Sequence, residues 1–439
     1  MAHIRPFAAI RYQTTGSTKL NLSDVIAPPY DVLDAAQKAA LQAKHPNNIV
    51  TVDCPFMPPK TVGPDEVYER ANTTLHAWIG AGILKRDRRP AMYPYTQSYE
   101  HSGRMFHRRG FICLVRLSPF GQGQVVPHEK THAGPIEDRI KLMRATGVQL
   151  SPIFGLFSDQ RGEVTKLLYQ NAGRPELDGT LDGVRNQLWS VTDAEVENHL
   201  IEAMGAKPIY IADGHHRYTT ALQYQKEIEQ TENGGAPLPA DHPANYCMFV
   251  LVGMQNDGLL ILPTHRMIGG IENFSMDEFR KAVGANFTIT ESAMPADRID
   301  EFADKTLHNA PPHTLGLYDG RTRKLYELRS ENHGILAKLE PSKSGAWQRL
   351  DVAILQRYLL DDVIQPRFGG GKDITKGYTA HPREILEQVD GKTYQIALLL
   401  KSTPLHALEE LGKAGEVMPQ KSTYFYPKLA TGIAINPIR

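Results

Sequence analysis

Short apolar runs alternate with segments of helical periodicity along nearly the whole chain. Residues 92–101 and 106–117 contain many aromatic and β-branched residues and are separated by a Ser-Gly pair, a pattern that predicts a β-hairpin. From Pro135 to Gly147, apolar residues recur at helical spacing between a residue that favours a helix start and one that favours its end. Because hairpins and helices are mixed, the pattern favours an α+β (mixed α/β) fold over a purely doubly wound sheet.

Further strands are predicted in the centre of the chain. Residues 149–157 and 208–212 are short apolar runs, and the second leads directly into the polar segment 213–217 and then into a helical pattern. Residues 245–253 and 259–262 flank an Asn-Asp-Gly turn, which predicts a second hairpin.

Helix starts and a domain boundary follow from local signals. The capping boxes Thr192-x-x-Glu195 and Ser275-x-x-Glu278 each predict the first turn of a helix. A change of pattern after residue 265 divides the chain into an N-terminal and central region, 1–265, and a C-terminal region, 266–439. The segment 418–428 is rich in Lys, Ser, Thr and aromatic residues, and we expect it to be a lid or loop that returns to the active site.

The composition narrows the class of protein. A length of 439 residues is enough for two or three domains. The 49 basic residues are balanced by 49 acidic ones, which argues against a dedicated nucleic-acid binder. The three cysteines lack metal or redox spacing, and no apolar run approaches the ~20 residues of a membrane helix. We therefore expect a cytoplasmic protein without nucleic-acid or membrane partners, and a homo-oligomer is compatible with these features.

One segment matches the zinc-protease signature H-E-x-x-H. His128-Glu129-Lys130-Thr131-His132 has the required residues, but the motif functions only on a helix that places both histidines on one face. Pro127 precedes the segment and Gly134-Pro135 follows it, so that a long helix does not fit. The segment is predicted to be a polar loop, either a functional one or a solvated one.

Asp213-Gly214-His215-His216-Arg217 is the most informative stretch of the chain. It lies between a predicted buried strand and a helix start, where backbone N–H groups bind anions. Gly214 permits a tight turn, and Arg217 has the geometry to grip phosphate oxygens. The alternative is structural, with Asp213 as a helix N-cap and the histidines in the core. Thr264-His265-Arg266, at the end of a predicted strand, and the Pro-Pro-Tyr-Asp turn at 28–31 are weaker candidates.

Taken together, these motifs resemble the domain-of-unknown-function 1015 family of bacteria and archaea over essentially the whole chain. The motifs that carry the resemblance are Ile4-Arg5-Pro6-Phe7, Ala27-Pro28-Pro29-Tyr30-Asp31-Val32, His128-Glu129-x-Thr131, Asp138-Arg139, Ser151-Pro152-Ile153-Phe154, Asp213-Gly214-His215-His216-Arg217-Tyr218, Thr264-His265-Arg266 and Pro419-x-Lys421-Ser422-Thr423-Tyr424-Phe425-Tyr426-Pro427-Lys428.

The Asp-Gly-His-His-Arg core is also similar to the phosphate motif of the ParB/sulfiredoxin/free-serine-kinase superfamily. This resemblance implies a central ParB/sulfiredoxin-like phosphate-binding core, elaborated by N- and C-terminal strand–helix segments. Sulfiredoxins have a reactive Cys where this chain has His215, which disfavours sulfinic-acid repair. The free-serine kinases have Asp-Gly-x-His-Arg, which Asp213, Gly214, His216 and Arg217 match.

The leading hypothesis is a nucleotide-dependent kinase that phosphorylates a small hydroxyl metabolite, with free serine as the first guess and ATP or ADP with Mg²⁺ as the cofactor. Asp213 would orient the substrate hydroxyl or a magnesium ion, and Glu129 is the candidate general base. The expected catalytic residues are Glu129, Asp213 and His216; the nucleotide and phosphate ligands are Gly214, His215, Arg217, Thr131 and Lys130; and the substrate ligands are His128, His265, Arg266, Lys421, Ser422 and Thr423.

Two other functions stay open at this point. A nucleotide-binding regulatory switch of the ParB-like type needs the same phosphate loop but no substrate base. A metal-dependent hydrolase built on the His-rich loops would need metal ligands that the sequence does not identify.

Overall fold

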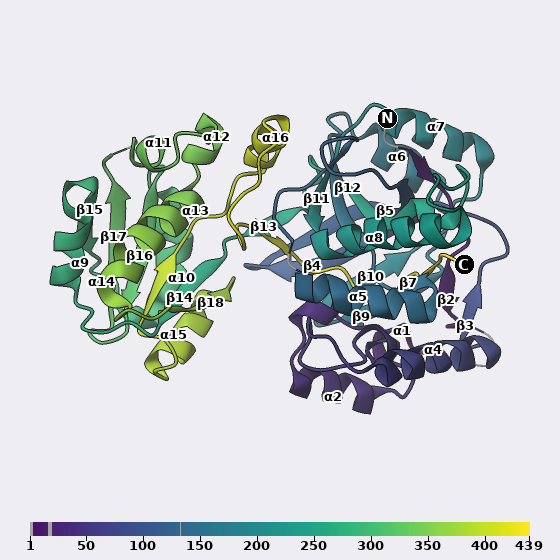
Figure 1. Ribbon diagram of the computed structural model, residues 1–439, viewed down its shortest axis with the longest axis horizontal. Helices are drawn as coiled ribbons and strands as arrows, with labels where there is room; N and C mark the ends of the chain where they lie inside the picture. Colours follow the sequence, from purple (N-terminus) through teal and green to yellow (C-terminus); the bar gives the residue numbers. More distant parts are fainter. Residues whose placement is uncertain (1–2, 16–19, 132, 333) are drawn as a thin grey trace. The chain divides into compact units, whose positions relative to one another are not determined.

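The computed structural model describes residues 3–15, 20–131, 133–332 and 334–439 (Figure 1). Contacts between residues divide the chain into two compact units. The first unit contains the residues up to Pro127, Thr131–Leu260 and Pro427–Arg439, and the second contains His128–Lys130 and Ile261–Tyr426. The first unit therefore takes its last segment from the C-terminal end of the chain. None of the described helices is long and apolar enough to cross a membrane.

The first unit is built on a nine-stranded mixed sheet. Its strands are, in spatial order, β6 (Val125–Val126), β11 (Ile209–Asp213), β8 (Ile153–Phe157), β12 (Tyr246–Gly253), β5 (Arg104–Arg116), β4 (Tyr93–His101), β10 (Val184–Leu188) and β9 (Leu177–Leu181), with β1 (Ile4–Arg5) also paired to β5. The β6–β11 and β8–β12 pairs are parallel, and β11 and β8 are antiparallel. Two small sheets join β2 (Ile10–Tyr12) to β3 (Leu84–Arg86) and β7 (Val148–Gln149) to β21 (Asn436–Pro437).

Helices flank this sheet. They are α1 (Leu22–Val25), α2 (Ala35–Lys44), α3 (Val50–Asp53), α4 (Asp65–Gly80), α5 (Ala133–Thr146), α6 (Glu163–Gln170), α7 (Ala194–Met204) and α8 (His215–Glu232). Figure 1 shows α5 and α8 side by side along the sheet. Ile140 and Met143 of α5 share one apolar cluster with Tyr224 and Ile228 of α8, so that the two helices bury a common face.

The second unit is a six-stranded antiparallel sheet with its own core. Its strands are, in spatial order, β15 (Phe287–Glu291), β17 (Lys324–Ser330), β16 (Thr314–Asp319), β19 (Ile396–Leu399), β14 (His265–Gly269) and β18 (Thr375–Thr379). Its longer helical segments are α9 (Met276–Val283), the π-helical segment Ile354–Ile364, α15 (Pro382–Asp390) and α16 (Leu405–Lys413). The mixed sheet of the first unit and the antiparallel sheet of the second confirm the α+β prediction.

The first predicted hairpin is confirmed, and the second is wrong. β4 and β5 pair in antiparallel register from Tyr93 opposite Ile112 to His101 opposite Arg104. β12, by contrast, pairs with β5 and β8, while β13 (Leu260–Leu262) pairs with β20 (Tyr424–Tyr426). Every residue of β12 is buried, and a fully buried strand has to satisfy its backbone groups at both edges, here with two other strands of the large sheet.

Some element ends differ from the predictions. The helix expected from Pro135 begins at Ala133. The strand expected over 149–157 is divided into β7 and β8, because Pro152 has no N–H for a strand ladder. At the first capping box the N-cap is Asp193, whose carboxylate accepts from the N–H groups of Glu195 and Val196. At the second box Ser275 is the N-cap, as predicted.

Candidate functional site

The Asp-Gly-His-His-Arg segment forms a strand–turn–helix in the first unit. β11 ends at Asp213, and α8 begins at His215. Between them Gly214 has a φ of +96°, a left-handed conformation that side chains with a Cβ rarely adopt. The register of β11 against β8 shifts between Ile211 and Asp213, a bulge that re-aims the end of the strand. The helix start has no side-chain cap, and its N-terminal dipole therefore faces the turn without a carboxylate or hydroxyl cap.

Asp213 is bonded to two cations. Arg217 Nη2 donates to Oδ2 at 2.9 Å, and Lys428 Nζ donates to Oδ1 at 3.1 Å. All three side chains are at most 22% exposed. Burial raises the pKa of Asp213, but Lys428, Arg217 and His215 outweigh burial and hold the pKa well below its usual range. Asp213 is therefore a permanent anion at neutral pH, in surroundings that are otherwise cationic.

Lys428 reaches this carboxylate because its backbone is fixed by β4 and β5. Gln97 Nε2 donates to the carbonyl of Lys428 at 3.0 Å, and Arg108 Nη2 donates to the carbonyl of Pro427 at 2.6 Å. Arg108 is buried and lies over the Phe154 ring, 4.7 Å from its centroid. Lys428, the last residue of the segment 418–428, thus contacts Asp213 of the candidate site. It belongs to the family-like motif, but the sequence analysis did not list it as a site residue.

The other predicted residues of the turn have different surroundings. His215 is buried in the first turn of α8, while His216 and Arg217 are partly exposed. Arg217 Nη1 also donates to the carbonyl of Pro152, which fixes the guanidinium beside the turn. Thr131, also in the first unit, lies in the loop that precedes α5. Its role as a phosphate ligand stays a prediction.

The remaining predicted site residues belong to the second unit. His128 is buried, its Nε2 lies 3.0 Å from Thr423 Oγ1, and its carbonyl accepts from the N–H of Met418. Arg266 is fully buried and donates through Nη2 to the carbonyl of Gln420 at 3.1 Å. The structure therefore brings His128 and Arg266 to the segment that contains Lys421, Ser422 and Thr423.

Burial shapes the chemistry of the two strand-end residues. His265 Nδ1 accepts from the N–H of Leu400, and burial, with Arg266 and His381, lowers the pKa of His265 to about 3. Burial also lowers the pKa of Arg266 to about 10, against the opposing charge of Glu129. Ser422 donates to the carbonyl of Pro419, and Lys421 is exposed with a φ of +57°. The substrate-binding roles of these residues stay predictions.

The signature-like segment 128–132 does not form a helix in its described part. His128–Thr131 lie outside any helix or strand, and His132 lies outside the described residues. Glu129 and Lys130 belong to the second unit and Asp213 to the first. The pairing of Glu129 with Asp213 therefore stays a prediction. Among the residues that the structure describes, no group of three or more His, Cys, Asp or Glu side chains is arranged to hold a metal ion.

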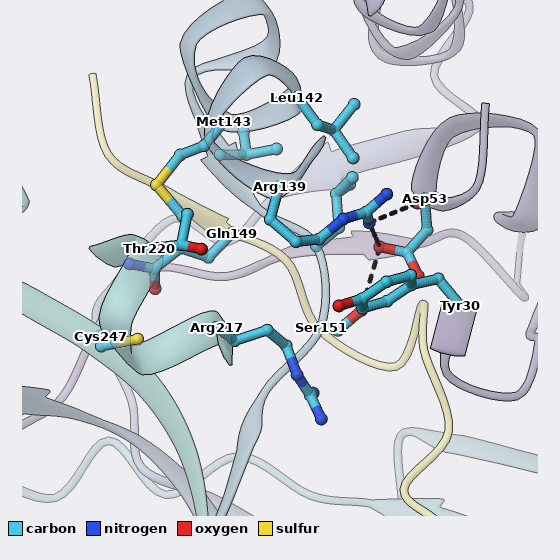
Figure 2. Close-up of a pocket in the computed structure, with 12 residues that line it drawn as sticks. Tyr30, Asp53, Arg139, Leu142, Met143, Gln149, Ser151, Arg217, Thr220 and Cys247 are labelled. Carbon is cyan, nitrogen blue, oxygen red and sulfur yellow. Dashed lines mark hydrogen bonds and ion pairs between the residues drawn. The ribbon is translucent and has the colours of Figure 1, made fainter. Parts of the chain in front are cut away.

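A buried ionic network near the turn was not assigned a function from the sequence. Arg139 donates through Nε and Nη2 to Asp138, and through Nη1 to the carbonyl of Asp53 at 2.6 Å. Its guanidinium lies 3.8 Å from the centroid of the Tyr30 ring, and Ser151 Oγ donates to Asp53 Oδ1 at 3.1 Å. Figure 2 shows Arg139, Asp53, Tyr30 and Ser151 around one cavity, with Arg217 extending from α8.

Residues from four family-like motifs line this cavity. Tyr30, Asp138-Arg139, Ser151 and Arg217 come from motifs that are distant in sequence, and Asp53, at the end of α3, lies in none of them. Their joint occurrence was the only signal in the sequence that they share a site.

The fold and the turn define an α+β protein with a strand–turn–helix suited to a small anion. Residues 4–353 match the family described as "Protein of unknown function (DUF1015)", and the chain belongs to this family, as the motifs predicted. No functionally curated protein matches the chain in sequence.

Several solved structures are similar to parts of the chain. A free serine kinase in complex with AMP is 13% identical with a TM-score of 0.32, over 69% of this chain and 83% of that one. A conserved hypothetical protein from Pyrococcus furiosus is 14% identical with a TM-score of 0.33, over 71% and 92%. C-terminally truncated SbnI from Staphylococcus aureus is 9% identical with a TM-score of 0.34, over 74% and 87%. At these scores and identities, neither ligand nor activity is carried over to this chain.

Proposed function

We propose that the protein is a nucleotide-dependent phosphotransferase that phosphorylates a small hydroxyl compound, with free serine as the first acceptor to test. The observation that carries the proposal is the turn between β11 and α8, where an uncapped helix start follows a left-handed glycine and a carboxylate held by two cations. Phosphoryl transfer requires mainly positioning and charge neutralisation, which such a turn supplies.

The proposed roles follow from the contacts of each group. The N-terminal end of α8, with His215, His216 and Arg217, binds phosphate oxygens of ATP or ADP. Arg217 contacts Asp213 and the Pro152 carbonyl through its two terminal nitrogens, and a guanidinium has five N–H donors in all. Asp213 acts as the anion that keeps Arg217 and Lys428 in place.

Magnesium fits this arrangement only as an ion bound to the nucleotide phosphates, and not as an ion coordinated by Asp213. Both oxygens of Asp213 accept from cations, so that a metal ion at this carboxylate would have to displace Lys428 or Arg217. We therefore assign Asp213 to the positioning of these cations, and we leave Mg²⁺ to neutralise the nucleotide phosphates.

The proposal is tested by incubating the protein with ATP or ADP, Mg²⁺ and a pool of hydroxylated metabolites that includes L-serine. We expect mass spectrometry to detect one new phosphorylated product, and R217Q to lower its formation at least about 100-fold. R185Q is the matched control, because Arg185 forms an exposed ion pair with Asp178. Tight nucleotide binding without any labelled acceptor would replace the kinase by the nucleotide-switch alternative.

The sequence-based assignment of Glu129 as general base has its own test. If Glu129 takes the hydroxyl proton, E129Q should lower kcat about 10²-fold or more and leave the nucleotide Kd unchanged. Unchanged product formation in E129Q, with nucleotide binding retained, would remove Glu129 from the mechanism and leave the turn in place.

A further inference from the structure

A small cavity adjoins the turn inside the first unit. Its volume is about 40 Å³, above the ~10–15 Å³ that one water molecule needs and far below the ~300 Å³ at which ordinary ligand pockets begin. Arg217 and Thr220 of α8 line one side, and Tyr30, Asp53 and Ser151 line another (Figure 2). The cavity is too small for a nucleotide, but it fits a group of a few heavy atoms beside the residue proposed to bind phosphate.

Two polar atoms in the cavity lining have no hydrogen-bond partner among the residues that the structure describes. They are Asp53 Oδ2 and Thr220 Oγ1, and the two residues are 3% and 0% exposed. A buried polar atom without a partner costs about 1–3 kcal/mol, so that such atoms call for a ligand or a role. The carboxylate oxygen requires a donor, while the hydroxyl donates or accepts.

Apart from Arg139 and Gln149, the rest of the lining is apolar. Leu142 and Met143 of α5 and Cys247 of β12 face the same cavity. A ligand group that complements both the apolar residues and the unpaired polar atoms of the lining has a short alkyl part and a hydroxyl. This description fits the hydroxyalkyl end of a small alcohol.

Among the described residues, the neighbours of Asp53 hold one oxygen and leave the other without a hydrogen-bond partner. Ser151 Oγ donates to Oδ1 at 3.1 Å, and Arg139 Nη1 lies 3.4 Å from the same oxygen. Burial raises the pKa of Asp53, against the opposing charges of Arg139 and Arg217. A carboxylate with a raised pKa is a better proton acceptor than a fully ion-paired one.

We propose that this cavity is the acceptor subsite of the phosphotransferase, that it binds the hydroxyalkyl group of the substrate, and that Asp53 is the general base in place of Glu129. The inference rests on the proposed function. The acceptor oxygen forms a bond to the terminal phosphorus of the nucleotide, and the bond from that phosphorus to the bridging oxygen breaks. The nucleotide leaves one phosphate shorter, and the hydroxyl proton moves to Asp53 Oδ2. Thr220 Oγ1 hydrogen-bonds the acceptor hydroxyl. Arg217 lies between the acceptor subsite and the proposed binding site of the nucleotide phosphates.

Binding of matched ligands tests the cavity without requiring catalysis. We expect calorimetry to show that L-serine binds about tenfold more tightly than L-alanine, and that ethanolamine binds about tenfold more tightly than ethylamine. Only the hydroxyl-bearing member of each pair can form hydrogen bonds with the unpaired atoms of Asp53 and Thr220. T220V should reduce this preference several-fold. T219V is the control, because Thr219 Oγ1 also lacks a partner but does not line the cavity. Equal binding within both pairs, or an equal effect of T219V and T220V, would overturn the subsite.

Kinetics of D53N test the base. We expect kcat to fall about 10²–10⁴-fold, with the nucleotide Kd changed less than about twofold and the fold retained by circular dichroism. A variant as fast as the unaltered protein overturns the assignment of Asp53 while the proposed function stands. If the unaltered protein phosphorylates no acceptor, the proposed function and the base both fail, and the ligand pairs alone decide whether the cavity binds a hydroxyl group.

Discussion

Two carboxylates of the first unit, the partly exposed Asp213 and the buried Asp53, lie near the same arginine, and their pKa values are shifted in opposite directions. Both oxygens of Asp213 accept from cations, and its pKa is well below the usual range. Asp53 has one oxygen without a partner, and burial raises its pKa. The two differ in the number of cations that they contact and in their burial, because Asp213 pairs with Lys428 and Arg217 while, in the described part of the chain, the more deeply buried Asp53 pairs with Arg139 alone.

The difference assigns different chemical work to the two groups. A carboxylate paired on both oxygens keeps its charge at all physiological pH values and holds its partners in place. A carboxylate with one unpaired oxygen is suited to exchange a proton. Pairs of titratable groups whose pKa values move apart are a recurring feature of active sites.

The largest expected effect comes from removing the fully paired anion. D213N leaves Lys428 and Arg217 without their carboxylate, and breaking a buried ion pair costs ~3–5 kcal/mol. We expect a loss at the lower end of this range, because all three side chains keep some exposure. Urea unfolding measures it, together with weaker nucleotide binding. D178N, in an exposed pair with Arg185, should cost less than about 1 kcal/mol. Equal losses would show that the Asp213 pairs contribute no more than a surface pair.

A smaller effect is expected from moving only one of the two cations. G214A forces a left-handed backbone at φ +96° and places a Cβ about 3.0 Å from the Arg217 guanidinium. The backbone term is ~1–2 kcal/mol, and displacement of Arg217 adds to it and weakens nucleotide binding. Gly103 has a φ of +73° and open space around it, so that G103A isolates the backbone term. If G214A and G103A lose the same stability and G214A binds nucleotide normally, then displacing Arg217 affects neither stability nor nucleotide binding.

The smallest effect is a pH dependence of opposite sign at the two carboxylates. Asp53 faces Arg139, Arg217, Ser151 and Asp138, and its folded pKa lies above the unfolded value. Its contribution to stability is therefore greatest at low pH and decreases as the pH rises through the folded pKa, because the folded state binds more protons.

D53N should accordingly gain stability relative to the unaltered protein as the pH rises above the unfolded pKa of an aspartate, about 4. D213N should lose relative stability as the pH rises from acid, because the folded pKa of Asp213 is depressed. Urea unfolding at several pH values measures both slopes. The same sign in both variants would contradict the contrast between the two groups.

Local signals in the sequence predicted the strand–turn–helix around Gly214 and the first hairpin. Both depend on residues that are adjacent in the chain, and the family followed from motifs spread over its length. The second hairpin failed because β12 finds its partners in β5 and β8, which no local pattern encodes.

The sequence singled out the centre of the candidate site but not the residues at its edges. Polar residues at the end of a predicted strand indicated the Asp213–Arg217 segment. No such signal indicated Asp53, since it ends a four-residue helix outside every motif. Lys428 lies 215 residues from the carboxylate that it contacts, and tertiary structure alone joins them.

The C-terminal segment also governs when the site can be completed. Lys428 is synthesised 215 residues after Asp213, and the contact between them closes a loop of that length. Closing so long a loop carries a large entropic cost, so that contacts of this range form late. During translation Asp213 and Arg217 emerge long before their lysine. A nascent chain therefore contains the turn at Gly214 before it contains Lys428. The candidate site is complete only after residue 428 has been synthesised.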